Sequence, residues 1–283
     1  MRLSLHLLLS SLGCATAGAC PEGQVRAGDK ACEAWELPAA ASAAEGGHWR
    51  PEPGIPWEWQ LHGRPEFDVV VDAWDVDLVL ATEADKEHIR SEATLICYFS
   101  AGSRENWRAD ADEYPEHALG EPLEGWPDER WVDIMDPTVR DIIEKRLDFA
   151  ADSGCHAVEP DNVDAYANAS GLPLNATEQL HFNHFLAEAA HARGLSVGLK
   201  NDLGQVRALE PHFDWALNEE CAAYAECGRL DPFLAANKAV FHVEYVNDWG
   251  RAAARAGEVC GHHPGFSTLI KHWDLDNRRL ACP

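Results

Sequence analysis

Carboxylate and carboxamide side chains recur in this chain directly after short apolar runs. The clearest case is the acidic segment from Glu159 to Asp164, and Asp202 and Glu219 follow two later apolar runs. Carboxyl groups gathered in one cleft raise one another's pKa values, so that one stays protonated while its neighbour is ionised. Hydrolysis of a glycosidic bond requires that pairing, with an acid for the leaving oxygen and a carboxylate as nucleophile or base. Each position alone is more typical of a solvated loop start, and only the set of positions together points to catalysis.

Other chemistries have weaker support in the sequence. It contains no GxSxG, HExxH or P-loop motif, and no GxGxxG follows an early apolar run, so a dinucleotide-binding fold is not indicated. The 14 histidines are scattered. His181 and His184 lie on a predicted helix, where packing or exposure to solvent is more common than metal binding. We therefore expect no metal ion and no cofactor.

Short apolar runs alternate with helical stretches, which is typical of a parallel sheet with crossover helices. The clearest helices are 137–152, which starts after a capping Asp136 and stops before Gly154, and 177–193, which ends at Gly194. The eight predicted strands are 67–73, 94–100, 131–134, 157–159, 196–199, 215–218, 239–244 and 267–270. Eight strands in regular alternation predict a single (β/α)8 TIM barrel of the α/β class, whose active site lies at the carboxyl ends of the strands.

The N-terminal region predicts export from the cell. Residues 1–19 combine a basic start, a short apolar run and small residues before Cys20, which is typical of a secretory signal peptide. We predict a loosely packed leader over residues 20–56, held by a disulfide between Cys20 and Cys32. Residues 57–283 are predicted to form the barrel. Removing Cys14 with the signal leaves eight cysteines, an even set that suits disulfides. We expect a secreted monomer; the alternative is a lipid anchor on Cys20 at the cell surface.

The overall charge narrows the class of partner. With 48 acidic and 23 basic side chains, the formal net charge is −25. Such a surface repels phosphate backbones and attracts polycations, so nucleic acid is excluded as an expected partner. On charge alone, a simple role in solubility is the more common explanation of the acidity. No later segment of the sequence is apolar enough to predict a transmembrane helix.

Five motifs in a fixed order resemble a known family. They are Cys97-Tyr98-Phe99-Ser100-Ala101-Gly102-Ser103 with Glu105-Asn106-Trp107-Arg108-Ala109-Asp110, Glu159-Pro160-Asp161-Asn162-Val163-Asp164, Gly198-Leu199-Lys200-Asn201-Asp202, Asn218-Glu219-Glu220-Cys221 and Val243-Glu244-Tyr245. Together they closely resemble family 114 of the glycoside hydrolases, the endo-α-1,4-polygalactosaminidase-like TIM barrels. The resemblance runs from about Trp57 to Tyr245, and it implies cleavage within α-1,4-linked galactosamine chains of galactosaminogalactan-type polysaccharides.

The resemblance also implies the catalytic pair. It makes Asp161 one catalytic carboxylate, expected as the nucleophile, and Glu219 the other, expected as the general acid/base. A cationic galactosamine-containing polysaccharide suits an anionic cleft. The residues that we expect to bind it are Asp72, Tyr98, Ser100, Glu159, Asn162, Asp164, Lys200, Asn201, Asp202, Glu220, Glu244 and Tyr245. Trp107 and Tyr166 are further candidates for stacking on sugar rings. A disulfide between Cys221 and Cys227 would hold the loop after Glu219.

Two other functions remain open at this stage. The first is a carbohydrate-binding barrel protein without catalysis, although binding alone requires neither Asp161 nor Glu219. The second is a glycosidase of another α-linked hexosaminide or galactoside. The acidic residues at the strand ends favour an amine-bearing substrate over this alternative.

Overall fold

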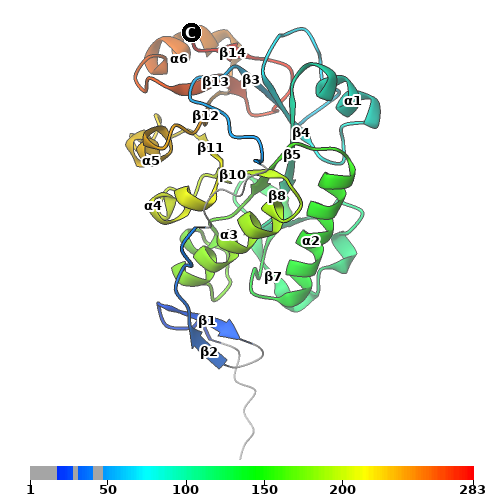
Figure 1. Ribbon diagram of the computed structural model, residues 1–283, viewed down its shortest axis with the longest axis vertical. Helices are drawn as coiled ribbons and strands as arrows, with labels where there is room; N and C mark the ends of the chain where they lie inside the picture. Colours follow the sequence, from blue (N-terminus) through cyan, green and yellow to red (C-terminus); the bar gives the residue numbers. More distant parts are fainter. Residues whose placement is uncertain (1–17, 28–30, 41–46) are drawn as a thin grey trace, which may run out of the picture.

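The computed structural model describes residues 18–27, 31–40 and 47–283 (Figure 1). It is an α/β fold built on a nine-stranded sheet in which only the edge strand β14 is antiparallel. From one edge to the other the strands are β14 (Leu280–Ala281), β13 (Phe266–His272), β12 (Val240–Val246), β11 (Trp215–Glu219), β10 (Ser196–Lys200), β9 (Ala157–Asp161), β5 (Thr94–Ser100), β4 (Ala73–Asp77) and β3 (Trp57–Gln60).

Helices connect most of the successive parallel strands and cover the outer face of the sheet, as Figure 1 shows. They are α1 (Glu83–Glu92), α2 (Pro137–Asp152), α3 (Ala176–His191), α4 (Val206–Leu209), α5 (Asp231–Ala235) and α6 (Ala252–Val259). The largest apolar cluster packs between helices and sheet, with Ile143 and Phe182 among its fully buried members. A second cluster, rich in aromatic rings such as Trp57, Trp215 and Phe241, fills the concave side. The sheet is therefore curled around a packed interior.

The two long helices form where the local signals in the sequence predicted them. In α2 the Asp136 carboxylate accepts a hydrogen bond from the Thr138 amide, and the helix ends before Gly154, whose φ is +71°. In α3 a capping box between Asn175 and Glu178 satisfies free backbone amides of the first turn. The predicted bounds of α2 are confirmed, and α3 begins one residue earlier and ends two residues earlier than predicted.

The two edges of the curled sheet meet through side chains. The Trp57 indole donates to the Ser267 carbonyl at 2.8 Å, and Lys271 on β13 forms a 2.7 Å ion pair with Glu58 on β3. Arg279, next to β14, donates to the Trp57 carbonyl at 3.0 Å. No backbone ladder joins β3 to β13 within the described ranges, so a fully closed eightfold barrel stays a prediction.

Two of the eight predicted strands differ from the structure. Residues 131–134 do not enter the main sheet, because β8 (Trp126–Val132) pairs with β7 (Leu119–Leu123) and β6 (Ser103–Glu105) in a separate three-stranded sheet. Strand β3 takes the place in the parallel sheet that we had assigned to residues 131–134. We had predicted its segment only as the start of the domain. The run predicted at 67–73 is shifted, since β4 begins at Ala73. The other predictions overlap the observed strands.

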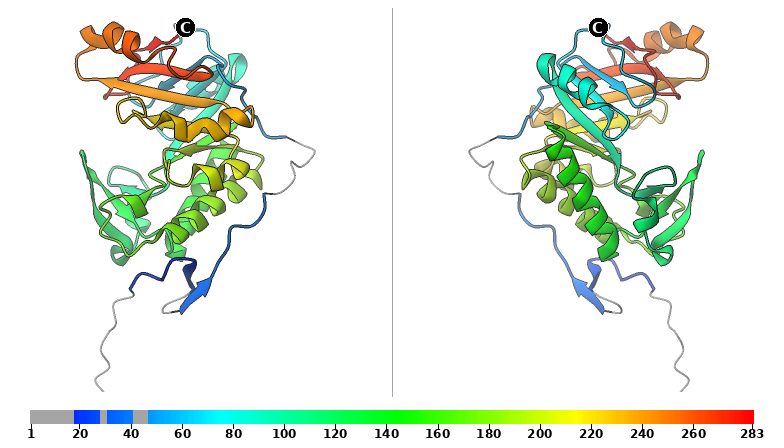
Figure 2. Two further views of the ribbon diagram at one scale, coloured as in Figure 1. Left: turned by 90° about the vertical axis from the view of Figure 1, so that its left-hand side faces the viewer. Right: turned by 90° about the vertical axis from the view of Figure 1, so that its right-hand side faces the viewer.

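The segment predicted as a loosely packed leader carries ordered structure of its own. Strands β1 (Gln24–Ala27) and β2 (Ala31–Ala34) form an antiparallel pair, and the predicted Cys20–Cys32 disulfide is present. Arg26 anchors the pair to the main body through Glu178 at 2.8 Å and Asp133 at 2.6 Å. Figures 1 and 2 place this hairpin and the C-terminus at opposite ends of the long axis. Residues 1–17, which hold most of the predicted signal peptide and Cys14, lie outside the described residues.

Four disulfides and six short 3-10 turns complete the described structure. The disulfides join Cys20 to Cys32, Cys97 to Cys155, Cys221 to Cys227 and Cys260 to Cys282. The turns are η1 (Ala111–Glu113), η2 (Glu116–Ala118), η3 (Ala165–Ala167), η4 (Glu210–His212), η5 (Cys227–Leu230) and η6 (Trp249–Arg251). Among the described helices, none has the length and apolar character that crossing a membrane requires.

Candidate active site

A cleft of about 450 Å³ opens at the carboxyl ends of the parallel strands. It is the place where the active sites of such α/β folds lie. Eight of the residues expected at the site line it: Tyr98, Asp161, Asn162, Asp164, Lys200, Asn201, Glu219 and Tyr245. The cleft therefore gathers the last residues of β5, β9, β10, β11 and β12.

One ammonium group links the two expected catalytic carboxylates. The Lys200 Nζ lies 3.3 Å from Asp161 Oδ1 and 3.4 Å from Glu219 Oε2. Because both oxygens contact the same nitrogen, their separation cannot exceed the sum of these two distances. Asp161 and Glu219 are each only partly exposed, with 19% and 24% of the side-chain surface accessible. The pair thus lies together at the floor of the cleft.

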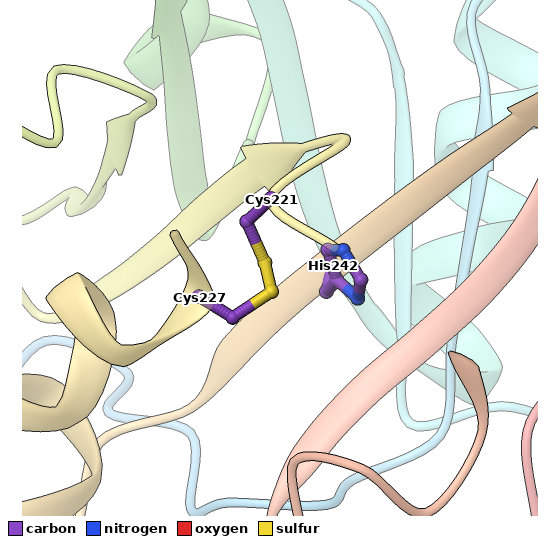
Figure 3. Close-up of side chains that lie close together, drawn as sticks. All are labelled: Cys221, Cys227 and His242. Carbon is purple, nitrogen blue, oxygen red and sulfur yellow. A yellow bond between two sulfur atoms is a disulfide. The ribbon is translucent and has the colours of Figure 1, made fainter. Parts of the chain in front are cut away.

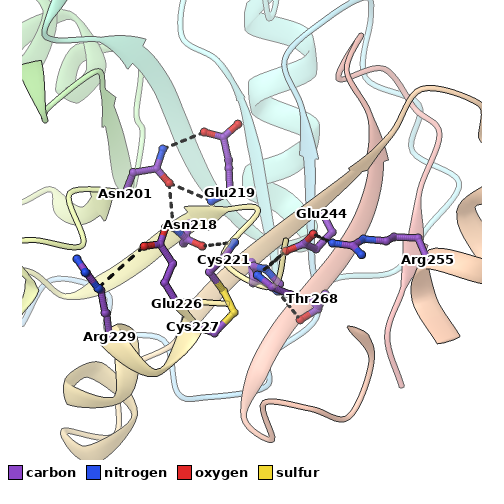
Figure 4. The surroundings of a disulfide bond; sticks show 12 residues. Asn201, Asn218, Glu219, Cys221, Glu226, Cys227, Arg229, Glu244, Arg255 and Thr268 are labelled. Atoms are coloured by element: carbon purple, nitrogen blue, oxygen red, sulfur yellow. Dashed lines mark hydrogen bonds and ion pairs between the residues drawn. A yellow bond between two sulfur atoms is a disulfide. The ribbon is translucent and has the colours of Figure 1, made fainter. Parts of the chain in front are cut away.

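The surroundings of Glu219 favour its ionised form. Tyr245 donates its hydroxyl to Glu219 Oε1. Asn201 Nδ2 donates to Glu219 Oε2 at 3.0 Å, a contact that Figure 4 shows. The side-chain oxygen Oδ1 of Asn201 in turn accepts a hydrogen bond from the Glu219 backbone amide at 2.9 Å, which fixes the backbone beside the carboxylate. Burial on its own would raise the pKa of Glu219, but Lys200, Tyr245 and Asn201 outweigh it and hold that pKa below its ordinary value.

Asp161 is positioned by a tight contact between two strand ends. Its Oδ2 accepts a hydrogen bond from Tyr98 at 3.2 Å, and its Oδ1 accepts the Asn162 amide at 2.7 Å. The amides of Ala101 and Gly102 both donate to the Asp161 carbonyl. A Cβ atom on Gly102 would lie 1.7 Å from the Asn162 carbonyl oxygen, so only glycine permits this approach.

Left-handed backbone follows each of the three central site residues. Asn162 after Asp161 has φ +61°, Asn201 after Lys200 has φ +47°, and Glu220 after Glu219 has φ +60°. Residues other than glycine adopt this region at a cost, and such residues cluster at functional sites. The chain turns sharply at these points, which leaves the preceding side chain at the rim of the sheet.

A buried ion pair supports the Lys200 ammonium from below. Glu159 Oε1 lies 2.6 Å from Lys200 Nζ, and the Trp59 indole donates to Glu159 Oε2 at 3.0 Å. Burial alone would lower the pKa of Lys200, yet Asp161, Glu159 and Glu219 together raise it well above its ordinary value. Lys200 therefore stays an ammonium whose charge is shared by three carboxylates.

Asp75 lies beneath this ion pair, where its surroundings favour the protonated acid. Its side chain is fully buried, and neither carboxyl oxygen receives a hydrogen bond from a described donor. An ionised carboxylate left in that state would be very costly. Burial raises the pKa of Asp75 well above its ordinary range, and the negative charge of Glu159 raises it further. Protonated Asp75 can donate to Glu159, so the pair shares one proton and one negative charge.

Sequence comparison assigns the family. The chain matches glycoside-hydrolase family GH114 over residues 38–283. The chain belongs to this family. Among solved structures, it is similar to Aspergillus fumigatus Ega3 in complex with galactosamine, with 37% sequence identity, a TM-score of 0.81, and coverage of 86% of this chain and 99% of that one. No curated protein matches it.

A more distant structure supports the fold alone. The glycoside hydrolase domain of PelA from Pseudomonas aeruginosa has a TM-score of 0.61 at 14% identity and covers 82% of this chain and 99% of that domain. As a member of GH114, the chain is a glycoside hydrolase. The carboxylate-lined cleft supplies the side-chain type that this chemistry requires.

Three expected residues of this GH114 site serve a neighbour instead of lining the cleft. Glu159 and Ser100 are fully buried, and Ser100 accepts a hydrogen bond from Asn162 at 2.8 Å. Asp202 accepts hydrogen bonds from Asn183 at 2.8 Å and from Tyr166 at 3.3 Å. Burial raises the pKa of Asp202 to about 8, and the nearby Asp164 adds to this effect.

Three more expected residues lie elsewhere. Asp72 precedes β4, at the opposite end of the sheet from the cleft, because that strand begins later than predicted. Glu220 lines a separate hollow on the other side of Tyr245. Glu244 is fully buried, where it binds His242 at 2.9 Å and pairs with Arg255 (Figure 4). None of the three lies among the residues that line the cleft.

The small sheet β6–β8 supplies cleft residues that the sequence did not reveal. Glu129 on β8 lines the cleft, and burial raises its pKa to about 7 although Ser103 donates to it at 2.8 Å. Trp126 from the same strand is half exposed at the cleft wall. Trp273 also lines the cleft and stacks on Tyr245 at 3.9 Å. The expected Trp107 is present, but Tyr166 is not among the lining residues.

The cleft is strongly acidic. Its carboxyl groups are Asp77, Glu105, Glu129, Asp161, Asp164, Glu219 and Asp274, and its arginine and lysine side chains are Arg108 and Lys200. Arg108 is already paired with Asp77 at 2.6 Å and with Glu105 at 2.7 Å. Burial and the charge of Asp161 raise the pKa of Asp164 to about 6. The site is thus poised to receive positive charge.

The predicted Cys221–Cys227 disulfide follows Glu219 directly (Figure 4). The Cys221 amide donates to the Asn218 side chain at 3.1 Å, and the Asn218 amide group donates to Asn201 at 3.1 Å. The disulfide therefore belongs to the same hydrogen-bond network that fixes Glu219 through Asn201. Such support keeps a catalytic carboxylate in one position.

Proposed function

We propose that this GH114 enzyme cleaves internal bonds of α-1,4-linked galactosamine polymers, with Asp161 and Glu219 as its catalytic carboxylates. The observation that carries the proposal is the shared contact of both carboxylates with Lys200 at the floor of an acidic cleft. The likeness to Ega3, which was solved with galactosamine at 37% identity, supports an amino sugar as the bound unit.

Cleft carboxyl groups with raised pKa values suit an amine-bearing sugar. Glu129 and Asp164, with pKa values of about 7 and about 6, are partly protonated near neutral pH. A sugar ammonium bound beside either group favours its ionised form, so each bound amine gains a new negative partner. A neutral sugar offers no such compensation. The cleft therefore discriminates in favour of deacetylated units.

The contact geometry supports a retaining mechanism. Retaining enzymes hold their carboxyl groups about 5–5.5 Å apart, and inverting enzymes about 6.5–9.5 Å apart. The Asp161 and Glu219 oxygens each lie within 3.4 Å of Lys200 Nζ, so the distance between these two oxygens is below most of the inverting range. In the first step Glu219 gives its proton to the glycosidic oxygen, and Asp161 attacks the anomeric carbon to form a glycosyl ester. In the second step Glu219 takes a proton from water, whose oxygen displaces Asp161.

The low pKa of Glu219 constrains when this reaction runs. A general acid must carry its proton when the substrate binds, and the free site favours the ionised form of Glu219. The value of kcat/KM should therefore fall as the pH rises through the lowered pKa of Glu219, which lies below the ordinary value for a glutamate. Lys200 stays charged throughout and balances whichever carboxylate is ionised.

Cleavage of a defined polymer tests the proposal. Purified protein is incubated with partially deacetylated galactosaminogalactan, and mass spectrometry should find released oligosaccharides of varied length. Asp161→Asn and Glu219→Gln should each abolish release while the fold and polymer binding persist. Asp148→Asn, on the exposed face of α2, serves as the matched control with full activity.

Each other outcome has a definite meaning. Release from a neutral α-linked galactan but not from the amino polymer would overturn the substrate. Polymer binding without any cleavage by the wild-type protein would mean that it is a carbohydrate-binding protein without catalytic activity. Unchanged activity in either carboxylate variant would remove that residue from the mechanism.

We also propose that the enzyme acts outside the cell. Four disulfides are typical of an oxidising compartment, and the apolar N-terminal sequence fits a signal peptide. N-terminal sequencing of the protein recovered from culture medium should find Gly18 or Cys20 as the first residue. An intact Met1 would contradict secretion by this route.

A further inference from the structure

Among the described residues, three groups of side chains other than Asp161 and Glu219 bring potential metal ligands within 4.8 Å of one another. Proximity alone does not make a metal site, because each ligand atom must also be free and aimed at a common point. Two of the three groups fail these requirements.

The first group is Cys221, Cys227 and His242 (Figure 3). Both sulfur atoms are joined in a disulfide, so neither is a thiolate ligand. The two ring nitrogens of His242 contact Thr268 at 3.1 Å and Glu244 at 2.9 Å. This group has no free ligand atom.

The second group is His48, His191 and Asp214. The two imidazole rings are stacked 4.1 Å apart with an angle of 4° between their planes. A metal ion lies close to the plane of each imidazole that binds it, and two parallel, separated planes share no such point. The Asp214 oxygens are already bound to His191 at 2.9 Å and to Arg50 at 3.1 Å. This group is a stacked pair anchored by hydrogen bonds.

The third group is His184, Glu188 and His212, and the spacing of its ligand atoms and rings is compatible with one shared metal ion. His184 and Glu188 are four residues apart on α3, which places them on one face, and His212 ends η4 beside them. The two rings lie edge to face, with centroids 4.9 Å apart and planes at 77°. Two imidazoles on one tetrahedral zinc ion, with Zn–N bonds of about 2.0–2.1 Å, have centroids about 5 Å apart.

All three ligands are available. Within the described part of the chain, the side chains of His184, Glu188 and His212 have no hydrogen bond or ion pair to another residue. The nearby Lys238 is held by Glu210 at 2.7 Å and by two backbone carbonyls.

We propose that His184, Glu188 and His212 form a Zn²⁺ site, with a water molecule as the fourth ligand. Two histidines and one carboxylate are an established donor set for zinc. None of the three residues lines the cleft that holds Asp161 and Glu219, so the ion would take no part in cleavage of the glycosidic bond. It would fasten α3 to η4, the turn that leads directly into β11 and Glu219. The packing of Trp35 near the His184 ring extends this connection to the N-terminal segment.

Metal titration of the folded, full-length protein tests the site. After treatment with a chelator, zinc chloride is titrated in competition with a chromogenic chelator, and thermal unfolding is followed with and without zinc. We expect one zinc ion per chain and a higher Tm in its presence. Binding of cobalt in place of zinc should give the intense visible absorption of a tetrahedral ion.

Variants assign the ligands and separate binding from folding. Glu188→Gln and His184→Ala should each weaken zinc binding by about tenfold or more and remove the zinc-dependent rise in Tm. Glu188 is exposed, so its variant should fold normally without metal. His48→Ala, in the stacked pair, is the matched control and should bind zinc as the wild type does. Absence of binding, or equal binding by the Glu188 and His184 variants, would overturn the proposal.

Discussion

Replacing Tyr245 by Phe tests the assignment of Glu219 as the general acid. The tyrosine hydroxyl donates to Glu219, and the phenylalanine ring preserves the stacking on Trp273. A hydrogen bond to a charged group is worth about 1.5–3 kcal/mol, and the lower end applies because a quarter of the Glu219 side chain is exposed. Since 1.36 kcal/mol corresponds to one pKa unit, loss of the bond should move the titration of Glu219 by about one pH unit.

The direction of the shift follows from which form the hydroxyl stabilises. Tyr245 stabilises the ionised carboxylate, so its removal raises the pKa of Glu219 and keeps the acid protonated to higher pH. The alkaline limb of kcat/KM reports the acid of the free enzyme. We expect this limb to move upward by about one unit in Tyr245→Phe, measured by release of reducing ends from a soluble galactosamine oligomer.

The control and the contrary results are equally specific. Tyr98→Phe removes the hydroxyl that contacts Asp161 and leaves the partners of Glu219 in place, so the alkaline limb should stay where it is. An unmoved limb in Tyr245→Phe would refute the reasoning. Movement of the acidic limb instead would mean that Glu219 must be ionised to react, and the roles of the two carboxylates would be reversed.

Two further predictions concern the supports of the site. Asp75→Asn keeps a donor for Glu159 and should unfold in urea within about 1 kcal/mol of the wild type, whereas Asp75→Ala should cost about 2–4 kcal/mol; equal losses would show that Asp75 is ionised. Replacing Cys221 and Cys227 together by alanine should lower kcat about tenfold with little change in KM, because Glu219 loses its fixed position. The same replacement at Cys20 and Cys32 should leave kcat unchanged, and equal effects would contradict this role.

Elements with strong local signals were predictable from the sequence. The α2 boundaries follow from Asp136-Pro137 at one end and Gly154 at the other, and these signals act within a few residues. The strand β5 is a long apolar run and was also predicted with its observed bounds. Short apolar runs carry less information. Residues 131–134 read as a parallel strand, yet β8 pairs antiparallel with its neighbours, and only tertiary contacts decide the partner.

The site was predictable where a side chain reaches the rim of the sheet. Glu159 and Asp161 are two residues apart on β9, so both point to the same face. Asp161 lies at the end of the strand and enters the cleft, whereas Glu159 is one layer deeper and serves Lys200. The sequence indicates the face but not the depth. Glu129 gave no signal at all, because the small sheet that brings it to the cleft was itself not predicted.

The arrangement that we propose as catalytic depends on sheet register more than on loops. Asp161, Lys200 and Glu219 end three adjacent parallel strands, β9, β10 and β11, and the lysine of the middle strand contacts both outer carboxylates. A slip of one residue in any of these strands would turn its last side chain away from the cleft and toward the helices. The aromatic interior opposes such a slip, because Trp215 on β11 packs directly over Gly198 on β10, where a Cβ atom would lie 2.3 Å from the ring. Glycine at position 198 therefore holds the register that brings Lys200 and Glu219 together.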